Sequence, residues 1–84
     1  MWKKNIKELD LHGKNRFEAN QAIKTFLLES YQQRERQVKI TYGTSGHVMR
    51  KTTIEELEIN PYVKEYENSF DLTGKIVYIK EKKK

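Results

Sequence analysis

Near its start the sequence carries a carboxylate and an imidazole two positions apart, in Leu9-Asp10-Leu11-His12-Gly13. The alternation of apolar and polar residues predicts a short β-strand with one buried face, and Gly13 ends it. Because side chains alternate across a strand, Asp10 and His12 share one face and the two leucines share the other. An imidazole beside a carboxylate can move protons near neutral pH, so this pattern indicates general acid–base chemistry.

A second stretch of chemical interest is the small-residue loop Gly43-Thr44-Ser45-Gly46, which precedes a helical pattern beginning at His47. The first N–H groups of a helix lack partners within it, and together with the helix dipole they favour a phosphate group. We therefore expect a phosphate-binding site with the acid/base pair Asp10 and His12 beside it. The residues expected to line it are Gly13, Lys14, Arg16, Tyr42, Gly43, Thr44, Ser45, Gly46, His47 and Arg50.

Each of these residues also has an ordinary structural explanation. A carboxylate at a strand end can cap a loop, and the histidine beside it can fill a gap in the packing. A Gly-x-x-Gly turn before a helix is commoner as a plain turn and cap than as an anion site. Tyr42 can be half-buried packing, and Arg50 can be a solvated surface residue. Only the convergence of all these residues at one end of the predicted sheet favours a functional site.

The first helix is the element that its own sequence indicates most clearly. Asn15 is placed to cap it, with Glu18 at the third helical position to complete a capping box. The helix is expected to run to about Gln33. Within the helix, apolar residues recur at helical spacing at Ala19, Ala22, Ile23, Phe26 and Leu27.

The other elements follow from β-branched runs and from turn residues. Val38-Lys39-Ile40-Thr41-Tyr42 is typical of a strand, and Asn60-Pro61 ends the second helix, because the residue before proline disfavours helical geometry. In order, we expect a strand over 6–11, a helix from 16 to about 33, a strand over 38–42, a helix over 47–58, a strand over 62–66 and a strand over 75–80.

The order β-α-β-α-β-β predicts an α/β two-layer sandwich with a mixed four-stranded sheet and both helices on one face. Strands joined through a helix are parallel, so the first three strands should run in one direction. The last strand returns antiparallel, most simply beside the third. The carboxyl ends of the first two strands then meet at one end of the sheet, where ligands bind in open α/β folds.

Length and charge limit the classes of function. The 84 residues make one domain, with 1–5 and 81–84 expected to be flexible, and the absence of cysteine excludes disulfides and thiolate metal sites. Seventeen basic and twelve acidic side chains give a net charge of +5, which suits a polyanionic partner, although several lysines belong to the terminal run 80–84. The oligomeric state is not indicated.

The sequence gives little support for a membrane span or for a bound metal ion. The longest apolar stretch is only a few residues, and no apolar run follows Met1-Trp2-Lys3-Lys4, so we expect no membrane span and a cytoplasmic protein. Asp10, His12 and His47 are of types that bind metals, but neither H-x-x-x-H nor H-E-x-x-H occurs. We expect no cofactor, and a divalent metal stays the weaker alternative.

The chain resembles a small MutS-related (Smr) domain over nearly its whole length. The resemblance begins at Leu9-Asp10-Leu11-His12-Gly13 and includes Glu18-Ala19, the glycine loop after the second strand, Val48-Met49-Arg50-Lys51 and Asn60-Pro61-Tyr62-Val63-Lys64-Glu65-Tyr66. It implies a fold like the C-terminal domain of a bacterial translation initiation factor, with the fourth strand between the second and the third.

The resemblance also implies nucleic-acid binding and endonuclease activity, either nicking DNA or cleaving RNA, in some members on messenger RNA at the ribosome. It implies catalytic or substrate-contacting roles for Asp10, His12 and the loop after the second strand. At that loop the family commonly has His-Gly-x-Gly, whereas this chain has Tyr42-Gly43-Thr44-Ser45, and the last turn is reduced to Thr73-Gly74. A binding module for RNA, DNA or the ribosome that does not cleave is therefore the alternative, and a protein-interaction domain is a third.

Overall fold

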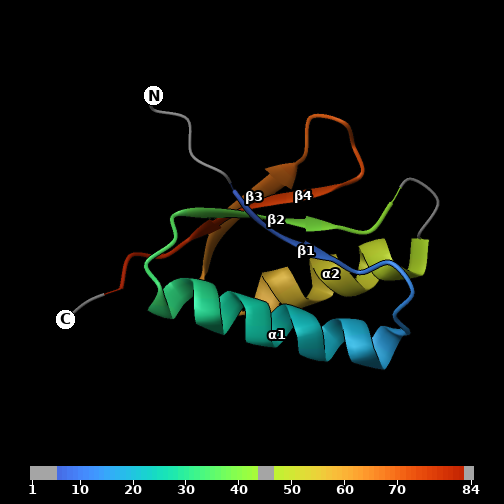
Figure 1. The fold of residues 1–84 in the computed structure, drawn as a ribbon, viewed down its shortest axis with the longest axis horizontal. Helices are drawn as coiled ribbons and strands as arrows, with labels where there is room; N and C mark the ends of the chain where they lie inside the picture. Colours follow the sequence, from blue (N-terminus) through green and yellow to red (C-terminus); the bar gives the residue numbers. More distant parts are fainter. Residues whose placement is uncertain (1–5, 44–46, 83–84) are drawn as a thin grey trace.

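The protein folds into a four-stranded sheet with two helices packed against one face, as a computed structural model of residues 6–43 and 47–82 describes it (Figure 1). This arrangement confirms the expected two-layer α/β fold. No helix in these ranges is long and apolar enough to cross a membrane. The elements are, in order, β1 (Lys7–Asp10), α1 (Arg16–Gln32), β2 (Gln37–Thr41), α2 (His47–Ile59), β3 (Val63–Asn68) and β4 (Gly74–Ile79).

The strand order is β1-β2-β4-β3, with β1 parallel to β2 and with β4 antiparallel to both of its neighbours. The fourth strand therefore lies between the second and the third, as the family resemblance implies, and β2 runs parallel to β3. We call the end at which β1 and β2 finish the carboxyl end of the sheet. The end at which β2 begins and β4 finishes is the amino end.

The third strand is longer than its sequence predicts. The expected strand over 62–66 begins at Val63 and continues to Asn68, so Glu67 and Asn68 are not part of a loop. These two residues pair with Ile76 and Lys75 of β4. The antiparallel ladder of the hairpin thus overrides the low strand propensity of their polar side chains.

The first helix begins with the predicted capping box. The Asn15 side chain accepts a hydrogen bond from the Glu18 backbone N–H at 2.8 Å, and the Glu18 carboxylate accepts one from the Asn15 backbone N–H at 3.1 Å. Both interactions satisfy N–H groups that the start of a helix leaves without partners. The cap fixes where the chain enters α1 after the β1–α1 turn, which is the turn that carries His12.

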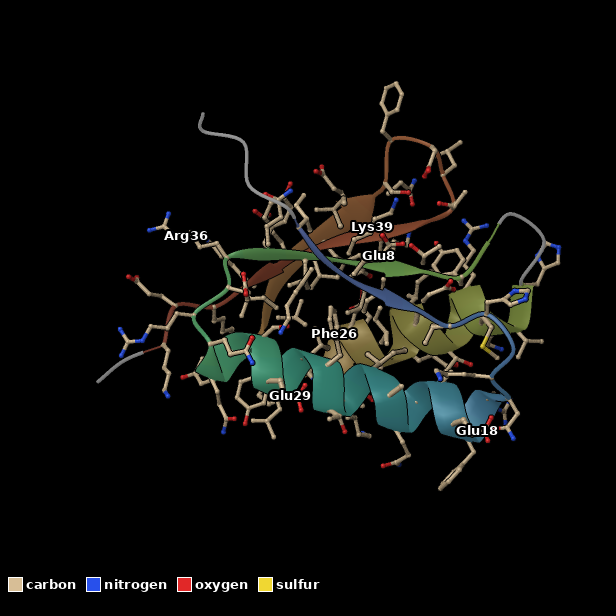
Figure 2. All side chains as sticks on the ribbon, in the orientation of Figure 1. Glu8, Glu18, Phe26, Glu29, Arg36 and Lys39 are labelled. Atoms are coloured by element: carbon tan, nitrogen blue, oxygen red, sulfur yellow. The ribbon has the colours of Figure 1, made fainter. Side chains whose placement is uncertain are left out.

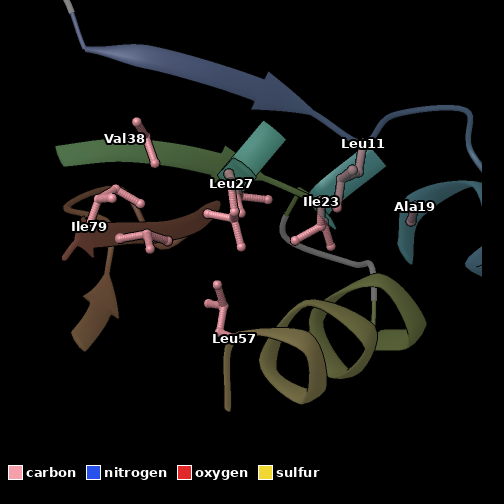
Figure 3. Packing of buried hydrophobic residues seen from close by; sticks show 9 residues of the cluster. Leu11, Ala19, Ile23, Leu27, Val38, Leu57 and Ile79 are labelled. Carbon is pink, nitrogen blue, oxygen red and sulfur yellow. The ribbon is translucent and has the colours of Figure 1, made fainter. Parts of the chain in front are cut away.

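The hydrophobic core lies between the sheet and the helices (Figure 3). Among the described residues, Leu57 is the only fully buried apolar side chain that α2 contributes. The other core residues come from α1, from the sheet and from Leu11 just after β1. They are Leu11, Ala19, Ile23, Leu27, Val38, Ile40, Val77 and Ile79.

A buried carboxylate ties the two helices together. Glu56 of α2 is 3 % exposed and accepts hydrogen bonds from Lys24 Nζ at 3.0 Å, Asn20 Nδ2 at 3.2 Å and Asn60 Nδ2 at 3.1 Å. A charge can be buried at tolerable cost only when it is paired and hydrogen-bonded in this way. The pairing of Glu56 with α1 therefore helps to set the position of α2, and with it that of the first turn of α2.

The face of the sheet away from the helices is rich in carboxylates. We call it the open face, and Figure 2 shows Glu8 and Lys39 there. Alternation along the strands places four acidic side chains and one lysine on this face, and an aspartate of the β3–β4 loop that pairs with the lysine lies at its margin. They are Glu8, Asp10, Glu65, Glu67, Asp71 and Lys39.

Gly74 is required by close packing between β4 and β2. A Cβ atom at this position would lie 2.0 Å from the Ile40 carbonyl oxygen and 2.8 Å from the Thr41 Cα. We predict that Gly74→Ala lowers the free energy of unfolding by about 3 kcal/mol or more, measured by urea denaturation. At Gly13, where φ is +79° and a Cβ has no neighbour within 4 Å, alanine should cost only about 1–2 kcal/mol. Equal losses in the two variants would contradict this packing.

Candidate functional site at the carboxyl end of the sheet

The turn after β1 presents the polar residues of the first motif to solvent. Asp10 pairs in register with Thr41, and the Leu11 backbone N–H donates to the Thr41 carbonyl at 2.9 Å. Leu11 is 1 % exposed, so it anchors the turn in the core while Asp10 and His12 are exposed. Gly13 then takes a positive φ of +79°, which glycine adopts without steric cost.

The Asp10 carboxylate contacts the backbone of His12. Its Oδ1 accepts a hydrogen bond from the His12 N–H at 2.9 Å, an Asx-type turn. Within residues 6–43 and 47–82, the His12 imidazole has no hydrogen-bond partner. The carboxylate therefore shapes the turn that presents the histidine, and it leaves the ring free to meet a ligand.

The end of β2 is fastened to the β3–β4 hairpin. The backbone N–H groups of Tyr42 and Gly43 both donate to the Thr73 carbonyl at 2.9 Å, and Gly43 has a positive φ of +88°. This contact fixes the direction in which the chain leaves the sheet towards α2. The predicted site residues Thr44, Ser45 and Gly46 lie outside the described residues.

The charge of Arg50 acts on two neighbouring side chains at this end, Tyr42 and Lys75. Burial raises the pKa of the Tyr42 phenol, and the charge of Arg50 opposes that shift. Burial also lowers the pKa of Lys75, and Arg50 lowers it further. We call Tyr42, Arg50 and Lys75 the cationic cluster.

Lys75 is the member of this cluster that was not among the site residues predicted from the sequence. It is 6 % exposed, its Nζ donates to Asn68 Oδ1, and it lies 5.8 Å from the centroid of the Tyr66 ring. The sequence does contain a signal, because Lys75 shares the alternation of Val77 and Ile79 and so falls on the helix-covered face of β4. A lysine in the apolar register of a strand is a candidate for a buried functional charge.

The remaining predicted cations lie on the helices and in the turn before α1. His47 and Arg50 share a shallow groove with Lys51 on α2. Arg16 lines a different groove between α1 and α2, where Glu55 is also present. Lys14 follows the β1–α1 turn and is partly exposed. The structure thus groups His47 with Arg50 and sets Arg16 beside α2.

The cations at this end of the sheet form no ion pairs with carboxylates of the described residues. Among the described residues the ion pairs within 4.0 Å are Lys24 with Glu56 and Lys39 with Asp71. None of the cations at the carboxyl end of the sheet belongs to either pair. Their positive charge is therefore available to an anionic ligand.

The acid/base pair and the cationic cluster approach this end from different faces of the sheet. Asp10 lies on the open face with Glu8, whose carboxylate accepts a hydrogen bond from Thr41 Oγ1 at 2.6 Å. Tyr42 packs against the core, on the face that the helices cover. No hydrogen bond or ion pair of the described residues joins Asp10 or the His12 ring to Arg50. A ligand that used both groups would cross the end of the sheet.

The described residues offer no set of side chains for binding a metal ion. Across residues 6–43 and 47–82, no three side chains of histidine, cysteine, aspartate or glutamate are grouped so that they could hold an ion.

Comparison with known proteins identifies the family. The family model for the Smr domain matches residues 9–75. The chain belongs to the Smr domain family. No curated protein sequence matches it. Its fold is similar to that of the Smr domain of Thermus thermophilus MutS2, with a TM-score of 0.85 and 19 % sequence identity over 89 % of this chain and 99 % of that one.

The family match covers the elements that build the candidate site. It begins at Leu9 and ends at Lys75, so it spans the motif of β1, the end of β2, the start of α2 and the first residues of β4. The Smr fold is known as a nuclease and nucleic-acid-binding fold.

A carboxylate accepts several hydrogen bonds within the turn of the hairpin that fastens β2. Asp71 Oδ1 accepts hydrogen bonds from Thr73 Oγ1 at 2.7 Å, from the Thr73 N–H at 3.1 Å and from Ser69 Oγ at 2.9 Å. The two Thr73 donors, with Ser69 and Lys39 nearby, hold the pKa of Asp71 well below its usual range.

This shift gives the stability a dependence on pH. Because the folded-state pKa is depressed, the stabilisation is present above the unfolded pKa of about 3.9 and is lost as the pH falls below it. We predict that wild type loses stability between about pH 5 and pH 2 more steeply than Asp71→Asn, which keeps an acceptor oxygen but cannot ionise. Urea denaturation at several pH values measures both slopes, and parallel slopes would contradict the role of the carboxylate.

Proposed function

We propose that the protein binds nucleic acid at the carboxyl end of its sheet and cleaves it there with His12. The observation that carries this proposal is the cationic cluster. Among residues 6–43 and 47–82, Arg50 and Lys75 have no carboxylate within 4.0 Å, and Lys75 is almost fully buried. Burial lowers the pKa of Lys75 and the charge of Arg50 lowers it further, and the negative charge of a phosphate group placed beside Lys75 would act in the opposite direction.

The position of α2 adds a second reason to expect a phosphate here. The helix has 13 residues and begins at His47, next to the end of β2. Its first N–H groups and the positive end of its dipole favour an anion at the same place as Arg50. Gly13 and Gly43 both have positive φ values and exposed or half-exposed backbone, which lets a ligand approach the chain closely.

The proposed chemistry is general acid–base catalysis by the His12 imidazole. On RNA it would take the proton from the 2′-hydroxyl that attacks phosphorus, or give one to the oxygen that leaves. Asp10 would position it through the backbone hydrogen bond at 2.9 Å. Such proton transfer is typically worth about 10²–10⁴-fold in rate, and Arg50 and Lys75 would stabilise the charge that develops on the phosphate.

The second candidate function is a module that binds RNA, DNA or the ribosome without cleaving it. One observation favours it. The position at which the family commonly has histidine is Tyr42, whose pKa is raised by burial, so this phenol is a poor proton acceptor at neutral pH. Cleavage would then rest on His12 alone, whereas binding needs only the cations.

The direct test of cleavage uses His12→Ala with labelled single-stranded RNA, duplex RNA and supercoiled DNA, with and without EDTA. We expect the rate at saturating substrate to fall by about 10²–10⁴-fold while the affinity stays the same. His47→Ala removes the other histidine and should change affinity without that loss of rate. A His12→Ala protein that cleaves as well as wild type would eliminate the mechanism, and a wild type that binds but never cleaves would favour the second candidate.

Binding itself is tested through its salt dependence. We predict that Arg50→Ala and Lys75→Met each lower the log–log slope of affinity against salt by about one, because each removes about one phosphate contact. Methionine keeps the volume of the lysine stem, so the sheet should stay intact, and the melting temperature checks this. A slope and an affinity that neither substitution changes would make Arg50 and Lys75 ordinary structural residues.

A further inference from the structure

A second concentration of positive charge lies at the amino end of the sheet, away from the motif residues. It surrounds a concavity of about 350 Å³ between the α1–β2 connection, the start of β3 and the chain that leaves β4. We call this concavity the amino-end pocket. Figure 2 places Arg36 there, at the end of the molecule opposite to the start of α2. Its basic side chains are Arg34, Arg36, Lys64, Lys80 and Lys82.

The charge balance of the pocket strongly favours an anion. Two carboxylates, Glu35 and Glu81, also line it, so its five basic and two acidic side chains carry a net charge of +3. None of the five basic side chains takes part in the ion pairs found within 4.0 Å among the described residues. Similar charges held around one concavity repel each other, and a bound polyanion would relieve that repulsion.

The walls of the pocket are fixed by the backbone. The Ile79 N–H donates to the Arg36 carbonyl, and the Lys80 N–H donates to the Tyr62 carbonyl, both at 2.9 Å. Arg34 has a positive φ of 62°, and its N–H donates to Tyr31 at 3.1 Å, so the turn that projects its side chain is well defined. Ile79 is 5 % exposed and forms an apolar floor. The backbone that carries Arg34, Arg36 and Lys80 is thus fixed by hydrogen bonds.

The carboxylates of the open face separate this pocket from the carboxyl end of the sheet. Glu65 and Glu67 of β3 and Glu8 of β1 lie on that face between the two ends. A polyanion is repelled from such a surface, so the pocket is a second site and not an extension of the first. The length of β2, five residues at about 3.3 Å each, sets a minimum spacing of about 17 Å between them.

We propose that the amino-end pocket is a second binding site for the phosphate backbone of a nucleic acid. This inference rests on the proposed function, because it takes the ligand at the carboxyl end of the sheet to be nucleic acid. A strand that reaches both sites must span at least about 17 Å. The second site increases affinity for longer chains by avidity and takes no part in the chemistry at His12.

The test compares the triple variant Arg34→Gln/Arg36→Gln/Lys64→Gln with wild type, using a single-stranded RNA of about twelve nucleotides. The triple variant should bind about tenfold or more weakly, with a salt slope lower by about two, since each single-strand phosphate contact contributes about 0.7. All three side chains are exposed, so the fold should tolerate them. The rate of cleavage at saturating RNA should not change.

Two single substitutions that each remove a negative charge test the pocket in the opposite direction. Glu35→Gln removes a carboxylate that lines the pocket, and Glu29→Gln removes one on the exposed side of α1, as Figure 2 shows. The two changes alter the net charge equally. Glu35→Gln should tighten RNA binding, and Glu29→Gln should leave it nearly unchanged. Equal effects would overturn the pocket, because they would reflect net charge alone.

The outcomes separate this inference from the proposed function. If Arg50→Ala lowers the salt slope and the triple variant does not, the pocket fails while the proposed site stands. If only the triple variant lowers it, the pocket stands and the site at the carboxyl end fails. A poly-glutamate peptide of equal charge that competes as well as the RNA would also overturn the assignment to nucleic acid.

Discussion

The parallel pairing of β1 with β2 is the constraint on which the candidate site depends. Its register sets Asp10 beside Thr41 and lets the Leu11 N–H reach the Thr41 carbonyl. A slip of one residue would turn Leu9 and Leu11 towards solvent and drive Asp10 into the core. The burial of two leucines therefore decides which polar side chains emerge at the carboxyl end, so packing and chemistry are specified by the same five residues.

Charge is distributed unevenly over the surface of the fold. A net charge of +5 spread evenly would offer a polyanion no preferred place to bind. Here five of the twelve carboxylates lie on the open face or at its margin, and cations that form no ion pair among the described residues lie at both ends of the sheet. Arg50 lies close enough to Lys75 for its charge to lower the pKa of the lysine. An anion bound beside them, as we propose, would offset that repulsion.

Local patterns in the sequence predict much of the fold. The capping box of Asn15 and Glu18, the helical spacing of α1 and the alternation around Leu9 and Leu11 are all confirmed, because each depends on residues near one another in the chain. The extension of β3 to Asn68 was missed, since it depends on pairing with β4. The position of β4 between β2 and β3 followed from the family resemblance and not from the spacing of residues.

The site is less predictable from the sequence than the fold. Alternation places Asp10 beside His12, but it does not reveal that the carboxylate bonds to the backbone and not to the ring. The roles of Lys75 and of the amino-end pocket need the tertiary structure, because their neighbours come from three separate segments. The roles of Asp10, His12 and the loop after β2 stay predictions.

The most direct test of the account is a two-dimensional amide NMR titration of the protein with a short RNA. If the carboxyl end of the sheet receives the phosphate backbone, the amide signals of Gly13, Gly43 and Arg50 will shift in proportion to the bound fraction, while those of Lys39 and Ile76, which pair midway along the sheet, will not. Signals of Gly13, Gly43 and Arg50 that stay in place at saturation would contradict the central claim.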